Sequence, residues 1–257
     1  MKKKWFGAVL AAIVVAATGV SAQAQTSARA GSGDWQFEIT PYVWMVGLDG
    51  NISANDKDVD FEQSFSDLIE NVDAAASVLG VAQYQKYVGF VQADWFSLSY
   101  NNDDFDQPVA QQFVEEVDLD QMFVTLAAGY QFPGFVADSW IDVMAAARMT
   151  DLKIDVKSLG NRSEDKSKTL WDPALVVRPT FILTDNKKFR FNPTLSIGGG
   201  GDSDLIYELQ PQFQYDFTET IAARLGYRRL YYKYTSDNDV EFKLTYSGFI
   251  AGVSFLF

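Results

Sequence analysis

The chain has 257 residues, of which 47% are hydrophobic and 15% aromatic, and it contains neither cysteine nor histidine. The lack of cysteine excludes disulfides, thiolate metal sites and lipoprotein attachment, and the lack of histidine excludes Ser-His and Asp-His catalytic pairs. The formal charge of −13 argues against nucleic acid as a partner, because its phosphates would be repelled.

The N-terminus has the pattern of a secretory signal peptide. The basic residues Lys2–Lys4 precede an apolar stretch, and Ala22-Gln23-Ala24 supplies a small-x-small cleavage site. We therefore expect residues 1–24 to be removed and residues 25–257 to form one mature domain, with a charge of −16 after the loss of three lysines. A second small-x-small site at 28–30 also fits cleavage.

From Trp35 onward, apolar and polar residues mostly alternate with a period of two, which is typical of strands. The alternation is less clean in 35–45 and 87–100. It is clearer in 141–149, 175–183, 189–197, 205–217 and 221–231. Tilted strands of about 9–11 residues are long enough to cross a bilayer. The apolar face would then meet lipid and the polar face would line a lumen.

The connections alternate in length along the chain. Short turns are expected near 86–87, 132–134, 185–186 and 216–220, and longer or more polar links at 48–73, 101–112, 158–169, 198–203 and 235–239. We expect an all-β fold, a transmembrane antiparallel up-and-down β-barrel of about ten strands. Eight or twelve strands also fit, because the link 48–73 has room for an extra hairpin. A short helical turn is expected at 66–72 in that link.

The last residues carry a specific pattern. Phe249, Ala251, Val253, Phe255 and Phe257 alternate up to a C-terminal phenylalanine. This end resembles the terminal strand by which the assembly machinery recognises outer-membrane barrels. We therefore assign a sorting signal to Phe249, Val253, Phe255 and Phe257.

Two further stretches carry a narrower resemblance. Pro41-Tyr42-Val43-Trp44 followed by Gly47-Leu48-Asp49-Gly50-Asn51, and Gly226-Tyr227-Arg228 followed by Tyr231 and Tyr232, are similar to segments of a group of proteobacterial outer-membrane barrel proteins. No function is attached to that group, so the resemblance implies a fold and a location and no activity.

Charged residues recur on the polar faces of the predicted strands. This lumen charge cluster comprises Asp142, Arg148, Arg178, Arg190, Glu208, Arg224 and Arg228. One interpretation is a positively lined constriction that favours anions. The other is an internal network of salt bridges that fills a narrow barrel, with Glu208, Asp142 and Asp172 as partners of the arginines. We favour the second interpretation.

Other motifs have simpler explanations. The alternating acids Asp56, Asp58, Asp60 and Glu62 suit one wet face of an extended segment better than a calcium loop, whose glycine is replaced by Phe61. The pairs Asp103/Asp104 and Asp118/Asp120 are typical of solvated loop charge rather than catalytic carboxylates. Aromatic girdles explain most of the tryptophans Trp35, Trp44, Trp95, Trp140 and Trp171 without a bound sugar.

We therefore expect a bacterial outer-membrane protein that is structural or surface-interacting, with no enzymatic activity, cofactor or metal. A small-solute channel or transporter that favours anions is the alternative function, and adhesion through the outer loops is a third. A soluble periplasmic β-sandwich is the alternative fold. The expected partners are outer-membrane lipid, lipopolysaccharide and the barrel-assembly machinery, and we expect a monomer.

Overall fold

The structure is a computed structural model, and it describes residues 35–54, 57–66, 72–101, 114–158, 162–236 and 240–257. The predicted signal peptide with both cleavage sites, Asp56, Asp103, Asp104 and nearly all of the predicted helical turn lie outside these ranges. One antiparallel sheet contains all thirteen strands. They are β1 (Trp35–Ala54), β2 (Lys57–Gln63), β3 (Val72–Tyr84), β4 (Tyr87–Asn101), β5 (Val114–Pro133), β6 (Ser139–Ser158), β7 (Arg162–Ile182), β8 (Phe189–Phe191), β9 (Thr194–Gly198), β10 (Leu205–Gln210), β11 (Gln212–Asp216), β12 (Ile221–Thr235) and β13 (Glu241–Leu256).

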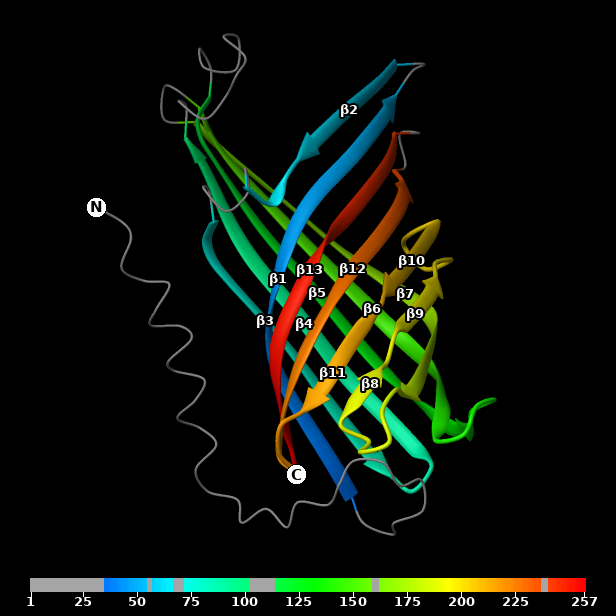
Figure 1. The fold of residues 1–257 in the computed structure, drawn as a ribbon. Coiled ribbons are helices and arrows are strands. Elements are labelled where there is room, and N and C mark those ends of the chain that lie inside the picture. The colour runs from blue at the N-terminus through cyan, green and yellow to red at the C-terminus, as the bar shows by residue number, and fades with distance from the viewer. Residues whose placement is uncertain (1–34, 55–56, 67–71, 102–113, 159–161, 237–239) are drawn as a thin grey trace, which may run out of the picture.

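These strands make ten barrel staves, as predicted. Two staves are interrupted, one between β8 and β9 and the other between β10 and β11. The interruptions fall at Pro193 and Pro211, because proline has no backbone N–H to donate to the ladder. The strand β2 lies outside the barrel wall and pairs with β1 as the predicted extra hairpin of the first long link (Figure 1).

The sheet closes between the first and last strands. β1 pairs with β13 from Glu38↔Leu256 to Ser53↔Glu241. At the end of this seam, the Phe37 amide donates to the Phe257 carbonyl at 3.1 Å, and the Phe257 amide donates back at 2.9 Å. In the turn-end half, each stave has a hydrogen-bonded neighbour on both sides, which is the condition for placing strands in hydrocarbon.

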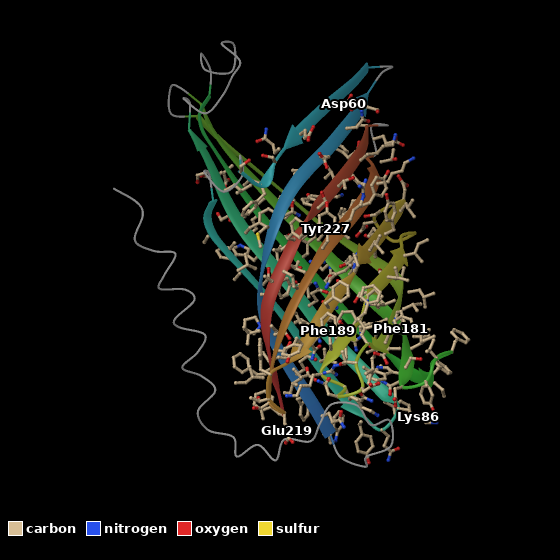
Figure 2. The ribbon with its side chains drawn as sticks, viewed as in Figure 1. Asp60, Lys86, Phe181, Phe189, Glu219 and Tyr227 are labelled. Atoms are coloured by element: carbon tan, nitrogen blue, oxygen red, sulfur yellow. The ribbon has the colours of Figure 1, made fainter. Side chains whose placement is uncertain are left out.

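The predicted short turns fall where the strands end. Short turns at 85–86, 134–138, 183–188 and 217–220 share one end of the barrel, here called the turn end. In Figure 2, Lys86 and Glu219 lie at this end and Asp60 lies at the opposite end, here called the loop end. The prediction of a long loop at 158–169 is wrong, because β6 continues to Ser158 and β7 begins at Arg162.

Several strands are much longer than a bilayer requires. β5 and β6 have 20 residues and β7 has 21, whereas about 9–11 residues cross the hydrocarbon. The turn-end half of each of these strands is therefore long enough to cross the hydrocarbon by itself (Figure 1). The sequence of 158–169 lacks the alternation that identified the other strands.

The barrel turns its apolar side chains outward. Many large hydrophobic residues are exposed around the wall, among them Trp35, Phe37, Ile39, Val91, Leu126, Leu175, Leu195, Phe213, Leu225, Phe249 and Val253. A soluble protein rarely exposes a contiguous apolar surface of this extent. The belt is the surface that lipid would cover, and it argues against the soluble sandwich.

The interior is mixed rather than uniformly apolar. Glutamines, threonines, arginines and carboxylates are buried there together with two apolar clusters. One cluster lies farther toward the loop end, around Phe123 and Tyr246, and the other includes Val88, Phe90 and Met144. The girdle interpretation is wrong for Trp44, which is buried inside, and Trp140 lines an internal cavity. Among the described residues, no helix has the length and apolar character to cross a membrane.

Candidate functional site in the barrel lumen

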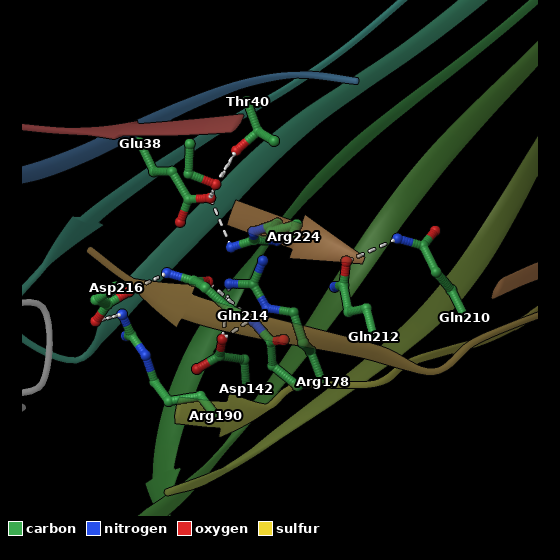
Figure 3. A network of polar contacts seen from close by, with 12 residues as sticks. Glu38, Thr40, Asp142, Arg178, Arg190, Gln210, Gln212, Gln214, Asp216 and Arg224 are labelled. Atoms are coloured by element: carbon green, nitrogen blue, oxygen red, sulfur yellow. Dashed lines mark hydrogen bonds and ion pairs between the residues drawn. The ribbon is translucent and has the colours of Figure 1, made fainter. Parts of the chain in front are cut away.

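Six charged residues meet inside the turn end of the barrel and are here called the turn-end cluster. They are Glu38 on β1, Asp142 on β6, Arg178 on β7, Arg190 on β8, Asp216 on β11 and Arg224 on β12 (Figure 3). They form three ion pairs, Arg224–Glu38 at 2.6 Å, Arg178–Asp142 at 2.8 Å and Arg190–Asp216. Each acid and its arginine come from different strands, which are adjacent for Arg178–Asp142 and Arg190–Asp216 and separated only by β13 for Arg224–Glu38. The pairs therefore tie neighbouring staves of the wall together.

The carboxylates of this cluster accept further hydrogen bonds. Glu38 accepts from the hydroxyls of Thr40 at 2.7 Å and Ser254 at 3.0 Å. Asp142 accepts from the Gln131 amide at 3.0 Å through the oxygen that does not face Arg178. These contacts fix the carboxylates in place. In Asp142, for example, each of the two oxygens accepts a hydrogen bond.

A second group, the central cluster, lies one layer nearer the loop end. It contains Asp94 on β4, Arg148 on β6, Glu208 on β10 and Arg228 on β12. Arg228 bridges two carboxylates, with Nη1 2.6 Å from Asp94 and Nε 2.6 Å from Glu208, and Arg148 also pairs with Glu208. All four residues are at least 96% buried, so these ion pairs are shielded from water.

Neutral side chains complete the central cluster. The Tyr42 hydroxyl donates to Asp94 at 2.5 Å and accepts from the Gln92 amide at 2.8 Å. The Arg148 Nε donates to the Thr125 hydroxyl at 3.1 Å. The Arg228 guanidinium lies 4.3 Å from the ring centroid of Trp44, a distance that suits a cation–π contact.

An apolar layer covers the central cluster on the loop-end side. Trp44, Phe123, Tyr232 and Tyr246 pack with Phe96, Leu98, Ile206, Leu230 and Ile250, and all of these residues are buried. Phe123 contacts three of the aromatic rings, with centroids 5.0 to 6.2 Å apart. The Tyr232 hydroxyl accepts from Thr150 at 2.6 Å, and the Tyr246 hydroxyl donates to Gln121 at 3.1 Å. The layer therefore combines close ring packing with satisfied hydroxyls.

All seven residues of the predicted lumen charge cluster are buried inside the barrel. They divide into two groups: Asp142, Arg178, Arg190 and Arg224 join the turn-end cluster, while Arg148, Glu208 and Arg228 join the central cluster. Of the three acids proposed as partners, Glu208 and Asp142 pair with arginines as expected. Asp172 instead accepts from the backbone amide of Ser203 at 2.8 Å.

The sequence analysis missed Glu38 and Asp94 as members of the site. Both lie on strands whose alternation is weak, since the inward face of β1 combines Glu38, Thr40, Tyr42 and Trp44. The signal that would have identified Glu38 is its even spacing from Thr40 and Tyr42. Arg190 was predicted to lie in the lumen, but its ion pair with Asp216 was not predicted.

The residues of the predicted sorting signal lie on and directly after β13. Phe249 and Val253 are exposed on the outer face of β13, and Phe255 and Phe257 are partly exposed at its end. Their role in sorting stays a prediction. Within the described ranges, no group of three or more acidic residues is arranged to hold a metal ion.

No protein-family model and no curated protein sequence matches this chain. Among solved structures, the outer-membrane protease OmpT from Escherichia coli matches with a TM-score of 0.54 at 9% identity, over 93% of this chain and 99% of that one. The chain has the fold of an outer-membrane β-barrel. At this identity the likeness concerns the fold alone, and the chemistry of the barrel has to be argued from its own residues.

Two other barrels match at lower scores. The transport unit of the autotransporter AIDA-I from Escherichia coli has a TM-score of 0.41 at 7% identity, over 97% of both chains. The attachment invasion locus protein Ail from Yersinia pestis has a TM-score of 0.37 at 10% identity, over 87% of this chain and 99% of that one.

Proposed function

We propose that this chain is an integral protein of a bacterial outer membrane whose lumen is sealed by its own side chains. It acts through its outer surface and loop-end extension, as a structural or surface-interacting protein. The apolar belt and the closed ten-stranded wall support the membrane location. The proposal includes export by a cleaved signal peptide, assembly through the C-terminal strand and a monomeric state, since a closed barrel requires no second chain.

The observation that carries this proposal is the order of layers inside the barrel. Along β12, Arg224 belongs to the turn-end cluster, Arg228 to the central cluster, and Leu230 and Tyr232 to the apolar layer. A solute that crossed the barrel would have to pass all three. Arg228 and Phe123 are each only 1% exposed, so neither side chain borders a water-filled channel.

The same geometry argues against an anion-selective constriction in the resting barrel. A selective ring presents unpaired charge to the solute. All five lumen arginines instead form ion pairs with lumen carboxylates. The interior therefore resembles the salt-bridge filling of a narrow barrel, in which side chains occupy most of the available volume.

We also propose that the barrel is not an enzyme. It has no histidine to act as a general base near neutral pH. Asp118 and Asp120 lie near the loop end of β5, and Asp118 accepts a hydrogen bond from Ser99 at 2.6 Å. Both are half-buried residues within a strand, so the prediction that they are loop residues is wrong.

Lipid and lipopolysaccharide are the partners that we propose for the outer surface. Arg229 is exposed on the outer face of β12, between Tyr227 and Tyr231 in sequence. Tyr231 stacks on Tyr207 at 4.7 Å, and Tyr227 packs edge-on against Phe249 at 5.4 Å. Tyrosines are enriched at membrane interfaces, and a cation among them would meet the anionic phosphates of the outer leaflet.

Single-channel recording of the refolded mature protein in planar bilayers tests the sealed lumen. We expect no discrete openings from protein whose fold is verified by heat-modifiable migration on a gel. The double variant Arg224→Ala/Arg228→Ala is the comparison, because it removes one arginine from each charged cluster. Openings in the wild type whose size or anion preference changes in the variant would establish a channel and overturn the proposal.

A further inference from the structure

We infer that the turn end of the lumen is a binding pocket for a small oxyanion, such as phosphate, sulfate or a carboxylate. The pocket is a cavity of about 90 Å³ between the turn-end mouth and the central cluster. Its lining includes three arginines and two acids, together with neutral donors: Arg178, Arg190, Arg224, Glu38, Asp142, Gln131, Thr180 and Gln214. These residues supply donors from five strands, β5, β7, β8, β11 and β12, to one enclosed space.

The first argument is an excess of buried donors. Arg224 is 93% buried, and only its Nη2 contacts a carboxylate, that of Glu38. Its Nε and Nη1 have no hydrogen-bond partner. Buried donors of a charged group that lack an acceptor are strongly destabilising, so such groups normally have partners. Arg224 therefore presents two free donors where an acceptor would stabilise the barrel.

The second argument concerns where the other guanidinium groups lie. Gln214 is directly opposite Arg190 on β8 and directly opposite Arg224 on β12, so the three side chains form one row across adjacent strands (Figure 3). Both Arg178 and Arg190 are near enough to repel the charge of Arg224. An anion between these guanidinium groups would reduce that repulsion.

The third argument identifies the charge of the ligand. Each carboxylate of the turn-end cluster already accepts from its arginine and from at least one neutral side chain. A cation would have to displace those donors, whereas an anion would use the donors of Arg224 that are unpaired. The pocket therefore fits an acceptor-rich ligand, and a planar or tetrahedral oxyanion matches guanidinium geometry.

The size and access of the cavity fit such a ligand. A cavity volume of about 10–15 Å³ holds one water molecule. The cavity of about 90 Å³ therefore has room for an oxyanion of four or five heavy atoms. The mouth is bordered by Gln36 and Phe257, at the turn-end limits of β1 and β13. No residue of the central cluster lines the cavity, and that buried cluster fills the lumen farther toward the loop end, so the site is a blind pocket and not a passage.

The experiment is a calorimetric titration, in which inorganic phosphate is added to the refolded mature barrel in a detergent without phosphate. We expect saturable 1:1 binding that sodium chloride at the same ionic strength does not reproduce. Arg224→Gln should weaken binding at least tenfold, and Glu38→Gln/Arg224→Gln should do the same without leaving Glu38 unpaired. Lys187→Gln is the matched control, because Lys187 is a turn-end cation that pairs with Asp138 outside the cavity.

A second measurement needs no variant and does not depend on how well the variants fold. Phosphate should raise the unfolding temperature of the wild-type barrel above that in chloride of equal ionic strength. Equal unfolding temperatures, or phosphate binding that Arg224→Gln leaves unchanged, would show that only water occupies the cavity and would overturn the inference. Repeating the titration with a short-chain anionic phospholipid distinguishes a free oxyanion from a lipid headgroup. Neither the titrations nor the unfolding temperatures test whether the lumen conducts ions.

Discussion

Replacing Arg228 by methionine removes a charge from the most buried part of the lumen while keeping most of the side-chain volume. Arg228 contacts Asp94 and Glu208 at 2.6 Å each, and its side chain is 1% exposed. Glu208 retains Arg148 in the variant, but Asp94 loses its ion-pair partner and keeps only the Tyr42 hydroxyl. The substitution therefore leaves one uncompensated carboxylate in a closed interior.

The size of the effect discriminates between a sealed and a water-filled lumen. Breaking a buried ion pair by removing one partner costs about 3–5 kcal/mol, because the remaining charge stays desolvated. Solvent-exposed pairs contribute only about 0–1 kcal/mol. We therefore expect Arg228→Met to lower the free energy of unfolding by about 3–5 kcal/mol. In a water-filled lumen the pair would behave as a solvent-exposed one, and the loss would be about 0–1 kcal/mol.

The assay is reversible denaturant unfolding of the barrel in lipid bilayers, followed by tryptophan fluorescence. Lys187→Met is the control, since its pair with Asp138 is more than half exposed. Combining Arg228→Met with Asp94→Asn should recover part of the loss, because the unpaired carboxylate is then neutral. A loss below about 1 kcal/mol for Arg228→Met, as for an exposed pair, would refute the sealed lumen.

Three further predictions test the apolar layer, the closure and the belt. Trp44→Ala should cost about 3–5 kcal/mol in denaturant unfolding, yet planar bilayers should record no openings, since the central cluster remains. Gly248→Ala should reduce the heat-modifiable folded fraction on a gel, because a Cβ there would collide with the Met45 carbonyl across the closing seam. Gly80→Ala is the control and should fold normally, because a Cβ there meets nothing within 4 Å. Leu225→Arg should cost about 2–4 kcal/mol in bilayers if this exposed position lies near the midplane, and an unchanged unfolding free energy would argue against a lipid contact there.

The alternation in the sequence was sufficient to predict the wall of the barrel. In 205–217 every second residue is apolar, and the even positions Glu208, Gln210, Gln212 and Gln214 are buried as expected. The number of staves followed from such segments and from the turns between them. Alternation did not identify the loop-end half of β7, because 162–169 is polar at every position. The loop-end half of β6 does alternate, through Leu152, Ile154 and Val156, and this signal was not used.

The contacts inside the lumen were not predictable in the same way. Periodicity tells which face a side chain occupies, but it does not tell which residue lies across the barrel. Arg228 and Asp94 are 134 positions apart in sequence and meet only because the sheet closes. Trp44 was assigned to a girdle for a related reason, since an inward tryptophan on a weakly alternating strand has the same local sequence as an outward one.

The side chains that fill the lumen give the two ends of the barrel different capacities to bind a ligand. Near the loop end, Phe123 and Tyr246 belong to a layer of packed rings whose tyrosine hydroxyls are hydrogen-bonded. This layer offers a solute the indole N–H of Trp44 as a free donor, but it offers no charged group. Near the turn end, Arg224 keeps donors without acceptors beside a cavity. Binding from the loop end therefore has to use the long strands and loops outside the membrane. Binding from the turn end has a preformed polar pocket, and the central cluster keeps the two apart.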